Sequence, residues 1–261
     1  MKIVDCFMFY NELDILKIRL TELYDVVDYF VLVEATGTHS KCKAKPLYYS
    51  ENKAMFEKYS DKIIHIVTDY NENFSFAKHI RSPNDHWFRE NYQRECISEG
   101  LKKLSLSDDD IVIISDADEI PNRNVIQAIR SQQLVLAEAV YSLEMTLYYY
   151  NIELTTPRKW YHAKIVNYGV CKKFNLLTDI RMSSNYILIR TGGFHLSYYG
   201  SVEFIKTKVE SFAESTEYTD AGKQTDHLRR CYNDGVLHFN NEKLVHIPLA
   251  TNSNVPLFFK Q

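Results

Sequence analysis

The sequence predicts an α/β fold with a doubly wound, Rossmann-like and mostly parallel central sheet that carries helices on both faces. Strand-like and helix-like segments alternate as far as Pro121, which is typical of β-α-β units with right-handed crossovers. Residues 111–114 are apolar and mostly β-branched without alternation, which favours a strand buried on both faces. Asp116, Asp118 and Glu119 follow at once. Ligands of open α/β sheets bind at the carboxyl ends of the strands, so we expect the functional site there.

The elements before this strand follow from apolar spacing and from the polar residues that end each run. Leucines recur at helical spacing from Leu13 to Leu23, directly after Asn11, which is a favourable helix cap. We expect strands at residues 2–10, 29–35 and 62–68, and helices at 12–24, 52–59 and from Asn84 or Asp85 to about Leu104. No Gly-x-Gly-x-x-Gly motif follows the first strand, so the dinucleotide-binding fingerprint is missing.

Beyond Pro121 the sequence becomes aromatic and rich in strand-forming residues. We expect helices at residues 124–132, 202–213 and 226–233, and strands within 138–151, 160–171 and 185–190. The pair Gly192-Gly193 indicates that the backbone approaches another group closely, with His195 just past the end of a strand. The tail from about Leu237 gives no clear pattern.

The composition excludes several classes of function. A net charge of -3 argues against a general nucleic-acid binder, which would have a basic face. No segment approaches the ~20 apolar residues that span a bilayer, and the first residues lead into a strand without a signal peptide, so we expect a soluble cytoplasmic protein. Five cysteines without a Cys-x-x-Cys pair predict reduced thiols. The 19 tyrosines suit sugar stacking, but they also suit cores and interfaces.

The acidic residues after the central strand indicate a metal site. Three carboxylates within four residues repel one another and lose hydration, which is costly unless a cation compensates them. A divalent ion such as Mg²⁺ or Mn²⁺, with oxygen ligands and a bound phosphate, would supply this compensation. The alternative is an acidic turn that only caps the next helix, because Asp and Asn favour such positions.

Several ordered segments resemble glycosyltransferase family 17, the family of the bisecting N-acetylglucosaminyltransferase that acts on N-glycans. Three of them are Trp-Phe-Arg-Glu-Asn-Tyr-Gln-Arg at 87–94, Ser-Asp-Ala-Asp-Glu-Ile-Pro at 115–121 and Gly-Gly-Phe-His-Leu-Ser-Tyr at 192–198. The others are residues 5–14, 19–25, 29–35 and 45–48. Phe194 stands where we expect Trp in the family, and it keeps an aromatic surface.

The resemblance implies a metal-dependent, inverting enzyme of the GT-A type. It would move a sugar, N-acetylglucosamine by default, from a UDP-sugar to a hydroxyl group of a glycan acceptor. A single domain, residues 1–261, would contain a nucleotide-binding half (1–121) and an acceptor-side half (122–261). Two alternatives stay open: a non-catalytic protein that binds nucleotide sugars or glycans, and a metal-dependent phosphohydrolase or nucleotidyltransferase.

The acidic motif and His195 receive metal-site roles from this resemblance. We expect Asp118 to bind Mn²⁺ or Mg²⁺, and Asp116 to hold the ribose or to bind the metal through water. Glu119 either orients these two residues or stabilises the N-terminus of the next helix. His195 is a third ligand, a diphosphate donor or a hydrogen-bonded structural residue.

The donor nucleotide is expected near the end of the first strand. The candidate contacts are Phe9, Tyr10, Asn11, Glu12, Glu34, Arg89 and Arg94. The alternatives are helix capping by Asn11, a satisfied buried acid at Glu34, and pairing of the arginines with Glu90 or Glu12.

An inverting reaction needs a carboxylate base within hydrogen-bond reach of the acceptor oxygen. The candidates are Glu144, Glu203 and Glu210, although acids on a helix surface are usually only solvated. The candidate acceptor-binding rings are Tyr148, Tyr149, Tyr150 and Trp160, with ordinary packing as the alternative.

Overall fold

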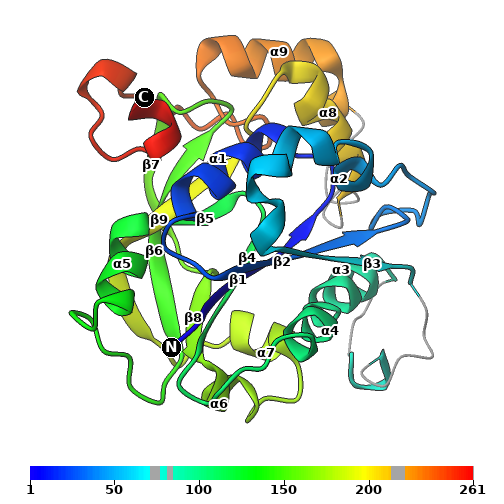
Figure 1. The fold of residues 1–261 in the computed structure, drawn as a ribbon. Coiled ribbons are helices and arrows are strands. Elements are labelled where there is room, and N and C mark those ends of the chain that lie inside the picture. The colour runs from blue at the N-terminus through cyan, green and yellow to red at the C-terminus, as the bar shows by residue number, and fades with distance from the viewer. Residues whose placement is uncertain (71–76, 81–84, 213–220, 261) are drawn as a thin grey trace.

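The structure is a computed structural model that describes residues 1–70, 77–80, 85–212 and 221–260. Within this part of the chain, ten strands form one sheet in the order β10-β7-β6-β8-β4-β1-β2-β3, with β9 paired to β6 and β5 paired to β9 (Figure 1). The strands are β1 (Ile3–Phe9), β2 (Tyr29–Ala35), β3 (Ile63–Thr68), β4 (Ile111–Asp116), β5 (Glu119–Pro121), β6 (Tyr141–Tyr149), β7 (Leu154–Trp160), β8 (Lys164–Asn167), β9 (Ile187–Ser197) and β10 (Val245–His246).

The first half of the chain builds the parallel part of the sheet. β1 pairs in parallel with β2 and β4, and β3 pairs in parallel with β2. The apolar runs of β1, β2 and β4 are buried along almost their whole length, as expected for strands covered on both faces. The predicted α/β fold class, with its Rossmann-like parallel strands, is confirmed.

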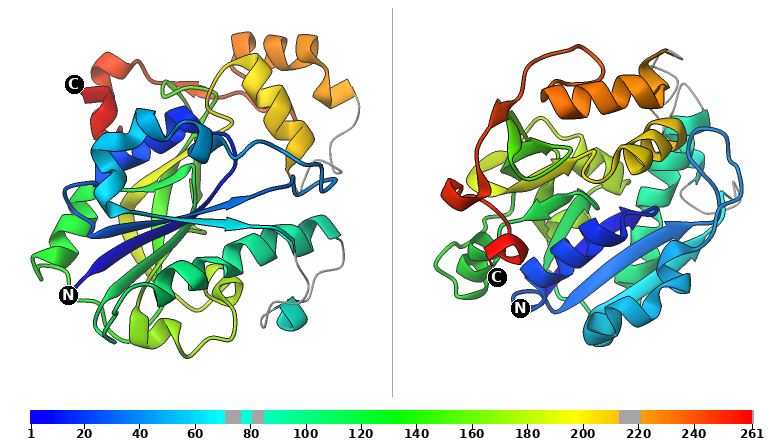
Figure 2. Two further views of the ribbon diagram at one scale, coloured as in Figure 1. Left: turned by 45° about the vertical axis from the view of Figure 1, so that its right-hand side comes forward. Right: turned by 90° about the horizontal axis from the view of Figure 1, so that it is seen from above.

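Helices cover both faces of these strands (Figures 1 and 2). The α-helices are α1 (Leu13–Leu23), α2 (Tyr48–Glu51), α3 (Asp85–Glu95), α4 (Ile97–Lys102), α5 (Arg123–Arg130), α6 (Tyr168–Cys171), α7 (Leu177–Arg181), α8 (Val202–Ser211) and α9 (Thr225–Asp234). The 3-10 segments are η1 (Lys53–Lys62), η2 (Ala77–His79), η4 (Ala221–Lys223), η5 (Leu249–Thr251) and η6 (Leu257–Lys260). Within the described ranges, no helix is long and apolar enough to cross a membrane.

Several boundaries differ from those predicted. The helix expected to run from Asn84 or Asp85 to about Leu104 divides at Cys96 into α3 and α4, and its expected cap Asn84 lies outside the described residues. The end point Ala213 expected for the helix at 202–213 also lies outside them. The helix expected at 52–59 is the 3-10 segment η1. Only part of the segment expected as a strand at 160–171 is one: β7 ends at Trp160, β8 covers Lys164–Asn167, and α6 begins at Tyr168. β7 and β8 both run antiparallel to β6 and in the same direction, so the strand is interrupted at residues 161–163 without a reversal of the chain. Apolar content alone did not reveal this interruption or the helix that follows β8.

Gly192 and Gly193 lie inside β9, which runs on to Ser197, so His195 is within a strand and not beyond its end. A Cβ atom on Gly193 would lie 2.4 Å from the carbonyl oxygen of Ile120, and one on Gly192 would lie 2.8 Å from Leu143. The predicted close approach is therefore that of β9 to its neighbours β5 and β6. It places His195 beside Glu119, its partner in the antiparallel register of β5 and β9.

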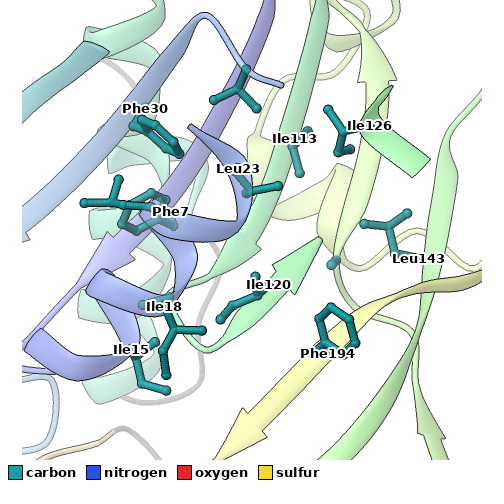
Figure 3. Close-up of a cluster of buried hydrophobic side chains, with 14 of the residues drawn as sticks. Phe7, Ile15, Ile18, Leu23, Phe30, Ile113, Ile120, Ile126, Leu143 and Phe194 are labelled. Atoms are coloured by element: carbon teal, nitrogen blue, oxygen red, sulfur yellow. The ribbon is translucent and has the colours of Figure 1, made fainter. Parts of the chain in front are cut away.

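The two halves of the chain share one hydrophobic core. Phe7 and Phe30 from the first half belong to the same buried cluster as Leu143 and Phe194 from the second. Figure 3 shows Ile120 of β5 between these two groups. The packing thus fixes the carboxyl ends of β1 and β4 relative to those of β6 and β9.

One buried charge pair lies under the acidic turn between β4 and β5. The guanidinium group of Arg19 on α1 is fully buried and donates to both carboxylate oxygens of Asp5, at 2.6 and 2.7 Å. Its remaining N–H groups bond Ser115 and the carbonyl oxygens of Asp116, Ala117 and Glu119. Arg19 therefore holds the backbone of the turn on which the acidic side chains stand.

We expect Arg19→Met to lower the free energy of unfolding by about 3–5 kcal/mol, because it leaves Asp5 as a buried, unpaired carboxylate. Lys17→Met is the matched control, because Lys17 is exposed on the same helix. Urea unfolding followed by circular dichroism measures both variants. Equal stability of the two variants would contradict this role for Arg19.

Candidate active site

The acidic turn lies where β4 ends and β5 begins. Asp116 is the last residue of β4, Asp118 lies in the turn, and Glu119 is the first residue of β5. Glu119 is fully buried, and its Oε2 accepts a hydrogen bond of 2.9 Å from the backbone N–H of Asp116. Glu119 thus orients the turn from within a strand, and it is not at a helix N-terminus.

Arg181 at the end of α7 balances two of these carboxylates. Its guanidinium group donates to Glu119 at 2.7 and 2.8 Å and to Oδ2 of Asp116 at 2.5 Å. Arg94 of α3 lies 3.4 Å from the other oxygen of Asp116, and the indole N–H of Trp160 donates to Glu119. Each carboxylate is therefore held in a defined orientation by cations or donors from the chain itself.

The arrangement separates the pKa values of the two carboxylates. Burial would raise the pKa of Glu119, but Arg181 outweighs it and lowers the pKa from 4.5 to about 2. The pKa of Asp116 is raised, because burial and the nearby charge of Glu119 outweigh the opposing attraction of Arg181. Two acids that share one guanidinium group titrate as a pair, and Glu119 is the one that stays ionised.

Asp118 has a different pair of partners. Its Oδ2 accepts a 2.6 Å bond from the ammonium group of Lys208 on α8, and its Oδ1 lies 3.5 Å from Nε2 of His195. Burial opposes ionisation, but Lys208 and then His195 hold the pKa of Asp118 well below its usual range. The Nδ1 atom of His195 is buried, and no group in the described part of the chain bonds it.

These groups line a cavity of about 790 Å³ between the two halves of the chain. The carboxyl ends of β1 and β4 form one wall, and the ends of β6 and β9 form another, as expected for an open α/β sheet. In Figure 1, α8 lies beyond the end toward which β1 points, and the hydroxyl of Tyr10 donates to Ser211 at 3.0 Å. The volume is within the ~300–1,000 Å³ typical of small-molecule sites.

The structure brings many of the predicted site residues to this cavity. Those that line it are Phe9, Tyr10, Glu12, Arg94, Asp116, Asp118, Tyr149, Trp160 and His195. The carboxylate of Glu12 also accepts the backbone N–H groups of Tyr10 and Asn11, which shapes the end of β1. The cavity surface thus combines acidic, basic and aromatic side chains.

Other predicted donor contacts do not line it. Glu34 is fully buried and satisfied by the N–H of Tyr49, by His65 at 3.1 Å and by Lys45 at 3.7 Å. Arg89 donates to the carbonyl oxygens of His39 and Ser40 and so fixes a loop. Asn11 does not cap α1 through its side chain, and its buried Oδ1 has no partner among the described residues.

The three candidate bases also lie away from the cavity. Glu144 is on β6 and lines a separate cavity of about 590 Å³. Glu203 is exposed beside Arg229, and Glu210 is exposed beside Lys206. Tyr148 and Tyr150, two of the expected acceptor rings, are buried in the core and do not reach the cavity surface.

Among the cavity residues that the sequence analysis did not identify, Arg181, Lys208 and His162 carry the charges and imidazole nearest the acidic turn. Lys208 carried the clearest signal, because it lies between Ile205 and Val209 on the apolar face of α8. Arg181 and His162 carried none, since they meet the acidic turn only through long-range packing. Burial, followed by the nearby charge of Arg181, lowers the pKa of His162 below 6.5.

The profile of glycosyltransferase family 17 matches residues 1–229. The chain belongs to glycosyltransferase family 17. This confirms the resemblance that the ordered motifs predicted.

Relatives of this family 17 protein include two enzymes named beta-1,4-mannosyl-glycoprotein 4-beta-N-acetylglucosaminyltransferase. The one from Homo sapiens is 35% identical over 118 residues, which cover 44% of this chain and 21% of the relative. The one from Rattus norvegicus is 32% identical over 127 residues, which cover 47% and 22%. The matched segment of the family 17 chain thus spans about a fifth of the length of these relatives.

Two solved structures also align with this family 17 protein. The crystal structure of 4-diphosphocytidyl-2C-methyl-D-erythritol synthase aligns with a TM-score of 0.40 and 11% identity, covering 72% of this chain and 89% of that one. The crystal structure of S. aureus TarS 1-349 aligns with a TM-score of 0.37 and 12% identity, covering 90% and 71%.

We expect Arg181→Met to destabilise the family 17 protein in a pH-dependent way. Glu119 has a lowered pKa, so its stabilisation is complete above pH 4.5 and is lost as the pH falls toward about 2. The variant should therefore lose roughly 3 kcal/mol of unfolding free energy at pH 7, and the loss should shrink below pH 4.5.

Urea titrations between pH 3 and pH 7 measure this difference. Arg190→Met is the matched control, because Arg190 is exposed on β9. A loss of the same size at every pH would mean that the Arg181–Glu119 pair does not govern the stability of the turn.

Proposed function

We propose that this protein transfers a sugar, N-acetylglucosamine by default, from a UDP-sugar to a hydroxyl group of a glycan, with inversion at the anomeric carbon. The observation that carries the proposal is the juxtaposition at the cavity of Asp116 and Asp118 with aromatic rings of the second half. Family membership supports the reaction class, and the names of the relatives support the default sugar.

The donor would bind on the wall formed by the first half. β1 ends at Phe9, whose ring is buried in the core, and the half-buried ring of Tyr10 that follows presents an aromatic surface for a base, beside Lys45. Asp116, which Arg94 and Arg181 fix, would accept hydrogen bonds from ribose hydroxyl groups.

A divalent cation fits the site in part. Asp118 and His195 offer one oxygen and one nitrogen 3.5 Å apart, and the described residues contain no group of three His, Cys, Asp or Glu side chains that could hold a metal. Mg²⁺ and Mn²⁺ sites of nucleotide enzymes commonly use one or two protein ligands and complete their shell with phosphates and water. Such an ion at Asp118 would offset the charge of the diphosphate leaving group.

The acceptor would bind on the wall formed by the second half. The rings of Trp160 and His195 are 4.6 Å apart, and Tyr149 stacks with Tyr198 at 6.5 Å. The described residues of the second half place no carboxylate on the cavity surface, whereas the imidazole of His162 lies there next to Trp160. His162 is neutral at pH 7 because its pKa is lowered, so it can accept the proton of the acceptor hydroxyl.

We expect Asp118→Asn to lower the turnover of UDP-N-acetylglucosamine with Mn²⁺ at least about 100-fold, since removing one group that offsets transition-state charge commonly costs that much. Asp109→Asn, in an exposed turn, is the control and should leave turnover unchanged. UDP release is the measurement. Normal turnover by Asp118→Asn would refute the role of the acidic turn, and cleavage of simple phosphate esters by the wild type would favour a phosphohydrolase.

We expect His162→Asn to lower kcat about 100-fold with little change in KM for the donor, the usual scale for loss of a general base. Protonation of His162 below pH 6.5 should make wild-type activity fall as the pH is lowered, and the pH–rate profile of the variant should lack this fall. His79→Asn, an exposed histidine, is the control. If His162→Asn keeps both the wild-type rate and the loss of activity at acid pH, another group accepts the proton of the acceptor hydroxyl.

A further inference from the structure

Lys208 is a buried cation on the cavity wall. It belongs to the face of α8 that also buries Ile205 and Val209, and only 4% of it is exposed. Burial of a lysine is costly unless its charge is paired, so its place in an apolar stripe requires a specific partner.

Two carboxylates of the first half provide that pairing. The Nζ atom lies 2.6 Å from Oδ2 of Asp118 and 3.9 Å from Oε1 of Glu12. Burial lowers the pKa of Lys208, but Asp118 and Glu12 outweigh it and raise the pKa, so the group is a cation at neutral pH. Lys208 thus occupies a cation position beside Asp118.

The ammonium group of Lys208 also lies near two aromatic rings. Its ammonium group lies 4.8 Å from the ring centre of Phe212 and 5.6 Å from that of Tyr198, and both rings line the cavity. The faces of these rings attract the Lys208 ammonium group, so it can also lie along the cavity wall away from Asp118. A lysine side chain is flexible and carries three rotatable donors, so a small movement of Nζ needs no movement of the helix.

The two arginines that the structure places on the cavity have more close polar partners than Lys208, and Lys45 has contacts of its own away from Asp118. Arg181 bridges Asp116 and Glu119, and Arg94 bonds Glu90, Asn91 and Asp116. Lys45 bonds the carbonyl oxygen of Pro46 and lies near Glu34 and the rings of Tyr10 and Tyr48. Among the residues that the structure describes, Lys208 has one close polar contact, to the carboxylate that a divalent ion would use.

We propose that Lys208 is a diphosphate-binding residue that competes with a divalent cation for Asp118 and, once displaced, pairs with the donor diphosphate. This inference rests on the proposed function, because it assumes that a nucleoside diphosphate binds in the cavity. An ion at Asp118 repels the ammonium group, and a diphosphate in the adjacent space attracts it. Lys208 therefore couples the binding of the metal to the binding of the donor. Without metal, its ammonium group still pairs with the diphosphate.

Isothermal titration calorimetry tests this with Mn²⁺ alone and with UDP in EDTA. In Lys208→Met, Asp118 loses its counter-ion, so the affinity for Mn²⁺ should rise about tenfold, and the affinity for UDP in EDTA should fall about tenfold. Lys206→Met is the matched control, because Lys206 pairs with Glu210 on the outer side of α8. It should leave both affinities as in the wild type.

Asp118→Asn provides a test that keeps the lysine. It releases Lys208, so metal-free UDP should bind at least as tightly as to the wild type, although turnover with Mn²⁺ is lost. Unchanged UDP affinity in Lys208→Met, Mn²⁺ affinity that does not rise, or weakened metal-free UDP binding in Asp118→Asn would each overturn the inference. If the wild type binds no UDP under any condition, the proposed function itself fails, which is a distinct result.

Discussion

The balance of buried charge at the end of β4 is the constraint on which the rest of the structure depends. Asp116, Asp118 and Glu119 stand on one short turn, and such crowding is unfavourable without compensation. Arg181 and Lys208 supply cations from α7 and α8, and Arg19 fixes the carbonyl groups beneath. The cations come from segments far along the chain, so the acidic turn reaches its final geometry only when both halves have packed together.

This dependence explains why the cavity lies between the halves. The sheet is continuous from β3 to β10, and one hydrophobic cluster spans it, so the carboxyl ends of its parallel strands are fixed with respect to one another. The first half contributes acids and the ring of Tyr10, and the second contributes rings, imidazoles and Lys208. A donor bound on one wall would therefore present its reactive carbon toward the other wall, where an acceptor can approach.

The sequence predicted the local features well and the long-range ones poorly. Uninterrupted apolar runs identified the parallel strands, and the acidic residues after the central run marked the site, because both signals lie within a few residues. The position of Glu144 did not follow from the sequence: it lies on β6 and lines a separate cavity. The pairing of Arg181 with Glu119 spans 62 residues and that of Lys208 with Asp118 spans 90, and no local pattern encodes either.

The central claim is that the acidic turn and its cations form the site for a donor diphosphate. A crystal structure of the protein with UDP and Mn²⁺ tests it most directly. We predict uracil near Phe9 and Tyr10, and a diphosphate within hydrogen-bond distance, about 3 Å, of the Lys208 ammonium group. A structure in which UDP binds elsewhere, or in which Lys208 keeps its 2.6 Å bond to Asp118 beside a bound diphosphate, would contradict the account.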